Sequence, residues 1–275
     1  MATTKNAAAP AKKSGFKGIK NAIWILVICG VVAYTFYFKV LGAPENFAGN
    51  DPTGHPLNLM GTVYKGGFVV GLILTLLLSV ICLGVERFFA LRAAFGTMSL
   101  GKFTIQVKEY IKAGKFDEAI ALCNKMKGSV ANVVLASITA YKDAEANNTL
   151  KKAQKIAKIQ QAHEEATQLE MPTLQMNLPI VATIVTLGTL TALFGTVTGM
   201  IKSFAALASG GGGDSVALST GISEALINTA LGILTSWLAV VSYNFFSNRI
   251  DKLTYALDEV GYTIAQTYEA NHDEA

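Results

Sequence analysis

The segment GISEALINTALGILTSWLAVVSYNFF, residues 221–246, is almost entirely apolar or small, and Glu224 is its only charged residue. About twenty apolar residues in a helix cross the hydrocarbon core of a bilayer, so the segment is long enough to span a membrane. A carboxylate in such a segment is costly unless it is paired, protonated or in contact with water. Glu224 therefore needs a partner or a function.

Three other segments of this kind lie upstream and contain no charged residue: 21–38, 66–85 and 178–201. Hydrophobic residues make up 51% of the 275 residues and charged residues 15%, a balance typical of membrane proteins. We expect an all-α integral membrane protein with four transmembrane helices. A basic stretch precedes the first segment, as in a signal peptide, but its apolar part is longer than usual and no small-residue cleavage site follows, so we expect a retained helix.

Basic residues alternate between the segments outside the predicted spans. Five lysines precede the first span and thirteen basic residues lie in 86–177, whereas 42–65 contains only Lys65. Lys and Arg accumulate on the cytoplasmic side of membrane proteins, so we expect both termini and the long loop in the cytoplasm. The expected organisation is a cytoplasmic basic arm at 1–20, an extra transmembrane helix at 21–41, a periplasmic loop at 42–65, a transmembrane helix at 66–85, a cytoplasmic helical domain at 86–177, transmembrane helices at 178–207 and 216–248 joined by a periplasmic turn at 208–215, and a cytoplasmic helix at 249–275.

The last apolar segment continues as an amphipathic pattern. Residues 216–248 would form a helix about 50 Å long, well beyond the roughly 30 Å of the hydrocarbon core. Apolar residues recur at helical spacing toward the C-terminus, at Ile250, Leu253, Leu257, Val260 and Ile264. We therefore expect long helices that extend from the membrane into a cytoplasmic helical bundle.

Glycine and proline predict where the helices of the long loop end. Gly114 follows an amphipathic segment and is expected to end a helix there. Pro172 and Pro179 predict a kink before the third span, because proline lacks the backbone N–H that a helix needs.

Catalytic and metal-binding patterns are not found in the sequence. The histidines and cysteines are widely scattered: His55, His163, His272, Cys29, Cys82 and Cys123. The run GGGGDS at 210–215 lacks the lysine of a phosphate-binding loop. We expect no enzyme activity, no metal and no cofactor. The scattered lysines do not favour nucleic acid as a partner, and contact with phospholipid headgroups explains them more simply.

Polar residues form stripes along the third span. Thr189, Thr196 and Ser203 recur every seven positions, a spacing that keeps them close to one face of a helix. Small residues that would let another helix approach closely are Gly195, Gly199 and, in the fourth span, Gly232.

The fourth span has two polar stripes. Five residues fall on one face of the helix, each within about 40° of Glu224 or at Glu224 itself: Thr220, Glu224, Asn228, Thr235 and Ser242. Thr229 and Ser236 lie about 120–140° away, so Glu224 and Thr229 do not share a face. Two helices with such stripes can line a polar cavity through the bilayer. The alternative is packing, since Ser and Thr in a span also bond to carbonyl groups of their own helix.

Lys202 lies near the outer end of the third span and allows two interpretations. Its ammonium group reaches the membrane interface, or it is a charge partner of Glu224 in the same or a neighbouring subunit.

These motifs resemble those of the ExbB/TolQ/MotA family. LFGTVTGMIKSF at 193–204 and LSTGISEALINTALG at 218–232 are similar to motifs of the family's two inner spans. ERFFAL at 86–91 and the segment 113–138 are similar to the exit from the preceding span and to a helical segment of the family's cytoplasmic region. Glu224 within GISEAL resembles the pattern of the ExbB/TolQ branch, and the sequence as a whole resembles ExbB more than TolQ.

The sequence departs from the family's usual pattern in two places. The helix at 21–38 is an addition to the three spans usual in the ExbB branch, and Lys202 is unusual within the motif of the third span.

The resemblance implies a bacterial inner-membrane subunit of a motor driven by the proton motive force. A homo-pentamer would place 178–207 and 216–248 around a pore that holds a dimer of an ExbD-like single-span partner. A TonB-like protein would couple the motor to import through outer-membrane receptors. Thr196 and Thr229 would face the partner's proton-binding Asp, with Glu224 nearer the outer end. The alternatives are a TolQ-like envelope-constriction role, a gliding or flagellar stator, or a passive membrane scaffold.

Overall fold

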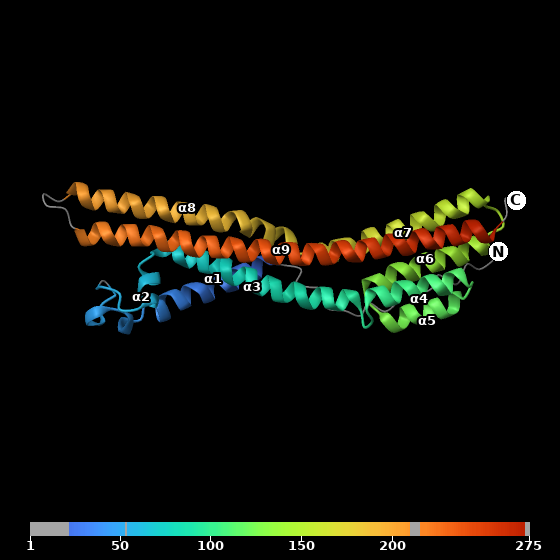
Figure 1. Cartoon of the computed structure of the whole chain (residues 1–275), viewed down its shortest axis with the longest axis horizontal. Coiled ribbons are helices and arrows are strands. Elements are labelled where there is room, and N and C mark those ends of the chain that lie inside the picture. The colour runs from blue at the N-terminus through green and yellow to red at the C-terminus, as the bar shows by residue number, and fades with distance from the viewer. Residues whose placement is uncertain (1–21, 53, 210–214, 273–275) are drawn as a thin grey trace, which may run out of the picture. The chain divides into compact units, whose positions relative to one another are not determined.

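A computed structural model describes residues 22–52, 54–209 and 215–272. Within those ranges the chain consists of helices joined by loops, and no strand is present (Figure 1). The helices are α1 (Ala22–Phe36), α2 (Leu59–Tyr64), α3 (Phe68–Phe95), α4 (Leu100–Lys112), α5 (Phe116–Met126), α6 (Ser129–Ala146), α7 (Lys152–Gln175), α8 (Leu178–Ser209) and α9 (Ser215–Asn271). The predicted basic arm at 1–20 lies outside the described residues, as do residues 210–214 of the predicted turn.

The chain divides into two compact units, each built from segments that are distant in sequence. Of the described residues, those in 22–86 and 177–245 form one unit, and those in 87–176 and 246–272 form the other. We name the first the membrane unit and the second the polar unit. Helices α3 and α9 contribute residues to both.

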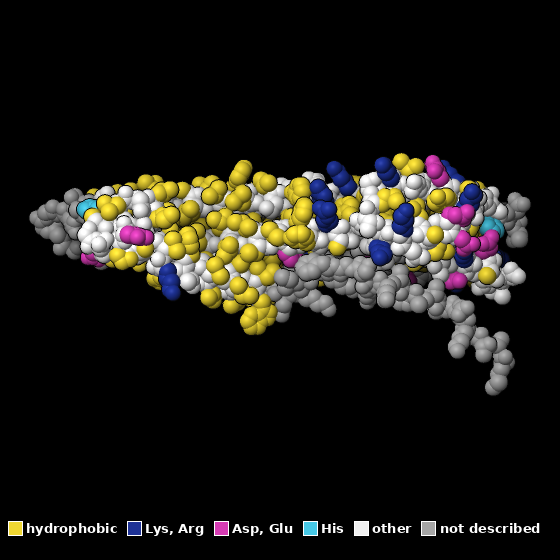
Figure 2. All heavy atoms as spheres, turned by 90° about the horizontal axis from the view of Figure 1, so that it is seen from below, with side chains coloured by type: hydrophobic (Ala, Val, Ile, Leu, Met, Phe, Trp, Pro, Cys, Tyr) yellow, Lys and Arg dark blue, Asp and Glu magenta, His cyan; other side chains and the backbone are white. Residues whose placement is uncertain are grey.

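Four helices that contribute to the membrane unit, α1, α3, α8 and α9, contain segments long and apolar enough to cross a membrane. Their inward side chains pack into a common core: Ala22, Val80, Leu83, Val181, Ile184 and Ala239. Apolar side chains cover much of the outside of this unit, whereas Lys, Arg, Asp and Glu are frequent on the polar unit (Figure 2). The predicted all-α membrane protein with four spans is confirmed.

The connection between α1 and α3 is folded rather than extended. A π-helical turn at Tyr37–Leu41 continues α1, and the Asn46 amide then donates to the carbonyl oxygens of Val40 at 2.7 Å and Leu41 at 3.0 Å. Tyr37 stacks on Tyr64 with ring centroids 4.8 Å apart, and its hydroxyl donates to the Tyr64 carbonyl at 3.0 Å. These contacts fix the end of α2 and hence the turn that opens α3.

The polar unit buries the amphipathic continuation of α9. All five apolar residues predicted to face a bundle are buried: Ile250, Leu253, Leu257, Val260 and Ile264. On the outside, Lys108 of α4 forms an ion pair with Glu259 of α9. The predicted long helix and helical bundle are therefore confirmed.

Helix ends in this part of the chain depend on backbone conformation. Gly114 has φ +70° directly after α4, a conformation in which glycine has no steric penalty, so the predicted stop is correct. The break before α8 lies at Asn177, which has φ +65°, and not at a proline. Pro172 lies inside α7, and Pro179 is the second residue of α8, where its missing N–H has no helical partner to lose.

His163 of α7 is buried between α6 and α9. Its Nδ1 lies 2.9 Å from the Ser137 hydroxyl oxygen, and a Cβ at Gly261 would overlap its ring. The Nε2 atom has no hydrogen-bond partner among the described residues. Burial lowers the pKa of His163, while the nearby carboxylates of Asp258 and Glu164 act in the opposite direction.

We predict that acid destabilises the polar unit through His163. Because burial lowers the pKa of the folded side chain, the unfolded chain binds a proton first as the pH falls below about 6.5. The free energy of unfolding should therefore fall as the pH drops below about 7, by at most about 1.4 kcal/mol per pH unit from this group. Thermal unfolding of the purified protein at several pH values measures it.

His163→Asn is the control, because its amide can bond to Ser137 but does not titrate. The variant should show a flatter dependence of the unfolding temperature on pH. The same slope in both proteins would contradict the assignment to His163.

Candidate functional site

Helices α8 and α9 approach each other closely within the membrane unit because glycines lie along their contact. A Cβ at Gly199 would lie 2.8 Å from the Gly221 carbonyl oxygen, and one at Gly232 would lie 2.7 Å from that of Gly188. A Cβ at Gly195 would lie 2.6 Å from the Asn228 Cβ. All three glycines expected to serve in packing thus lie at this contact, where any larger side chain would force the helices apart.

The close approach brings two hydroxyl groups together. The Oγ1 atoms of Thr196 in α8 and Thr229 in α9 are 2.6 Å apart, and either can donate to the other. Each can instead donate within its own helix, Thr196 to the Ala192 carbonyl at 3.0 Å and Thr229 to the Ala225 carbonyl at 2.9 Å. Since each hydroxyl has a single hydrogen, the direction of the contact can reverse. A reversible hydroxyl pair is suited to pass on or stabilise a proton.

Glu224 forms a second polar contact. Its side chain is only 7% exposed, and its Oε1 lies 2.6 Å from the Lys202 ammonium, which is 56% exposed. A Cβ at Gly67, in the turn before α3, would overlap the Glu224 carboxylate. The carboxylate is therefore enclosed between a lysine of α8 and the turn that opens α3. Of the two interpretations of Lys202, the structure agrees with the second: Lys202 forms an ion pair with Glu224 of the same chain.

Other polar residues of the predicted stripes are mostly satisfied by backbone carbonyls. The Asn228 amide donates to the Gly66 carbonyl at 2.9 Å, and the Ser203 hydroxyl donates to the Leu218 carbonyl at 3.1 Å. Thr235 donates to the Leu231 carbonyl at 2.8 Å. Asn228, Ser203 and Thr235 are buried in the unit, so within a single chain these side chains contact neighbouring helices.

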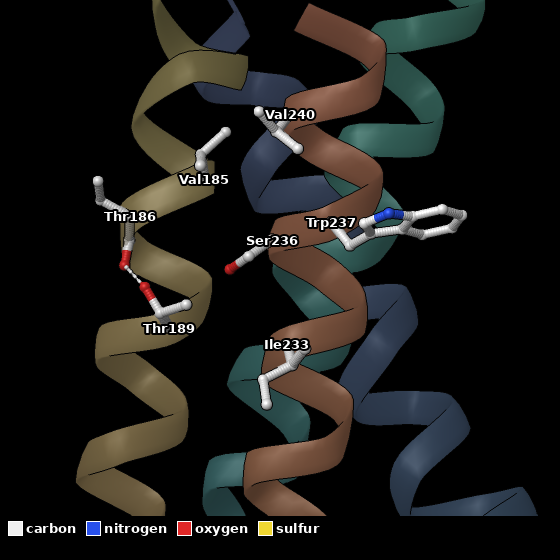
Figure 3. Close-up of a pocket in the computed structure, with 7 residues that line it drawn as sticks. All are labelled: Val185, Thr186, Thr189, Ile233, Ser236, Trp237 and Val240. Atoms are coloured by element: carbon white, nitrogen blue, oxygen red, sulfur yellow. Dashed lines mark hydrogen bonds between the residues drawn. The ribbon is translucent and has the colours of Figure 1, made fainter.

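Thr189 lies apart from these residues and lines an open groove between α8 and α9. The groove has a volume of about 350 Å³. Its lining residues are Val185, Thr186, Thr189, Ile233, Ser236, Trp237 and Val240. Figure 3 shows the Ser236 hydroxyl pointing toward α8, with α1 and α3 behind the pair. The mainly apolar groove lies on the side of α8 and α9 that α1 and α3 leave open.

The candidate residues thus form two groups. Thr196 and Thr229 meet across the contact between α8 and α9, whereas Glu224 and Asn228 point toward the turn at Gly66 and Gly67. The helical arithmetic that placed Glu224 and Thr229 on different faces agrees with this. Sequence reasoning missed Gly66 and Gly67, although two adjacent glycines at the start of a span are a signal for close backbone approach.

Comparisons with known proteins agree with one another. Residues 131–259 match the MotA/TolQ/ExbB proton channel family. The chain is 35% identical over 112 residues to the Tol-Pal system protein TolQ of Pseudomonas aeruginosa, and 34% identical over 88 residues to that of Haemophilus influenzae. It is 37% identical over 79 residues to the biopolymer transport protein ExbB of Salmonella typhimurium.

The matched segments cover only part of this chain and only part of each relative. They cover 41%, 32% and 29% of this chain, and 47%, 39% and 32% of the three relatives. The chain thus spans about half or less of the length of the curated relatives it matches.

We predict that substitution of glycine by leucine lowers the stability of the protein at Gly199 but not at Gly101. Gly199→Leu should destabilise the protein by about 1–3 kcal/mol or more, because the added side chain overlaps α9. Gly101→Leu is the control: nothing lies within 4 Å of a Cβ at Gly101, and leucine favours a helix over glycine, so this variant should be neutral or more stable. Thermal unfolding of both variants measures this. Equal effects would show that the contact at Gly199 is not tight.

Proposed function

Because the chain belongs to the MotA/TolQ/ExbB proton channel family, we propose that it is the ExbB-like subunit of a motor driven by the proton motive force. The motor lies in the bacterial inner membrane. Five copies surround a dimer of an ExbD-like single-span protein, and a TonB-like protein carries the motion to outer-membrane receptors for active import. The Salmonella typhimurium relative is named a biopolymer transport protein, which supports a role in transport.

The observation that carries this proposal is the contact between Thr196 and Thr229. Two hydroxyl groups 2.6 Å apart link α8 and α9 inside the membrane unit. One proton that crosses a potential of 100 mV releases about 2.3 kcal/mol. In the proposed assembly the hydroxyl pair faces the proton-binding Asp of the partner, where it stabilises the carboxylate or passes on its proton.

The orientation of the chain follows from the basic residues. Thirteen of them lie in 86–177 and one in 42–65, so we place the polar unit and both termini in the cytoplasm and the loop at 42–65 in the periplasm. Helices α8 and α9 then line the pore, with the groove at Thr189 and Ser236 on the side that faces the partner helices.

A TolQ-like role is the second candidate, since two of the relatives carry that name. Expression of this chain with its own ExbD-like partner in two bacterial strains separates the candidates: one strain lacks its ExbB-type subunits and the other its TolQ-type subunit. Restored energised uptake supports the ExbB-like role, and restored envelope integrity without uptake supports the TolQ-like role.

We predict that Thr196→Val slows proton flux without unfolding the protein. Valine keeps the shape of threonine but removes the hydroxyl, and loss of one hydrogen bond in the path should reduce flux roughly tenfold. Flux is measured in liposomes that contain the chain and its ExbD-like partner.

Thr198→Val is the matched control. Thr198 donates to the carbonyl of Gly195 in its own helix, so its hydroxyl is expected to be dispensable. Equal flux in wild type and Thr196→Val would overturn the role given to the hydroxyl pair.

A further inference from the structure

The turn before α3 is shaped to receive the Glu224 carboxylate. Gly67 has φ +78°, a conformation that favours glycine, and it directly precedes Phe68, the first residue of α3. A Cβ at Gly67 would overlap Glu224 Oε1 and lie 3.1 Å from its Cδ. The space that glycine leaves is therefore the space that the carboxylate occupies.

This position is the N-terminus of a long helix. The first N–H groups of a helix have no partner in their own helix, and the end carries a partial positive charge. Capping residues usually supply a side-chain oxygen there, but Gly67 has no side chain. A carboxylate from α9 is complementary both to this end of α3 and to the Lys202 ammonium at 2.6 Å.

Asn228 strengthens the same connection. It lies one helical turn after Glu224 on α9, is fully buried, and donates to the Gly66 carbonyl at 2.9 Å. Two successive side chains on one face of α9 thus hold two successive residues of the turn. Lys202 adds α8 to the connection, six residues from Thr196, while Glu224 lies five residues from Thr229.

We propose that Glu224 caps the N-terminus of α3 from α9, and that this cap with Lys202 is a positioning device for the Thr196–Thr229 pair. Glu224 holds its neighbours and does not carry the transported proton. Its capping role stands on the contacts of the membrane unit alone, whereas its effect on proton flux rests on the proposed function.

A double-mutant cycle tests the cap without any assumption about function. The variants are Gly67→Ala, Glu224→Ala and their combination, compared by thermal unfolding of the purified full chain. Gly67→Ala should lower the unfolding temperature in the wild type and have a much smaller effect in the Glu224→Ala background, where the overlap with the carboxylate is gone.

Gly49→Ala is the matched control for backbone strain. Gly49 has φ +73° in the same membrane unit, and nothing lies within 4 Å of a Cβ there. The effect of Gly67→Ala should exceed that of Gly49→Ala in the wild type and approach it in the Glu224→Ala background. An effect of Gly67→Ala that is the same in both backgrounds would overturn the cap.

Proton flux in liposomes with the ExbD-like partner tests the positioning role. Glu224→Gln keeps an oxygen that can accept from α3 and from Lys202, but it does not titrate. It should keep about half or more of the wild-type flux, whereas Glu224→Ala should lose roughly tenfold. If Glu224→Gln unfolds normally and its flux is as low as that of Glu224→Ala, Glu224 carries protons and the proposal fails.

The two experiments distinguish a failure of the proposed function from a failure of the proposed cap. Wild-type liposomes without proton flux would contradict the proposed function, and the double-mutant cycle would still decide whether Glu224 caps α3.

Discussion

A helix in hydrocarbon satisfies its own backbone, so the distance to which two helices can approach decides which of their side chains meet. In the pair α8 and α9 that distance is set by glycines. Gly199 lies against Gly221, and Gly232 against Gly188, with no room for a further carbon atom. The threonine side chains of Thr196 and Thr229 are short, so their hydroxyl groups reach each other only because the two helices lie so close together. Their contact is a consequence of the packing.

The same approach separates two kinds of polar chemistry within one unit. Hydroxyl groups tolerate an apolar surrounding, because each can return to a carbonyl of its own helix when it has no other partner. A charged carboxylate has no such option and needs a counter-charge or donors from elsewhere. Glu224 finds a counter-charge in Lys202, and its carboxylate lies beside the turn at Gly67, away from the hydroxyl pair. The two groups therefore serve different neighbours although they lie on the same two helices.

Periodicity predicts this fold well because the helices are long and their patterns are strong. The apolar segments coincide with α1 and its π-helical turn, with most of α3, and with parts of α8 and α9, and the buried Ile250 and Ile264 confirm the extension of α9. The break at Asn177 was not predictable from the prolines, since it depends on one backbone angle. Nor could periodicity place Glu224 beside Gly67, because the two residues are distant in sequence and meet only through tertiary packing.

Helix α9 is a single helix of 57 residues that belongs to both units. The helical repeat fixes the direction in which each of its side chains points relative to the others. One inserted residue would therefore turn everything beyond it by about 100°. Inside the polar unit, an insertion between Ile250 and Gly261 would turn either Ile250 out of the bundle or Gly261 away from His163. Seven added residues would restore the rotation to within about 20°, but they would shift everything beyond them by roughly 10 Å along the axis. Natural changes in length should therefore accumulate in the loops.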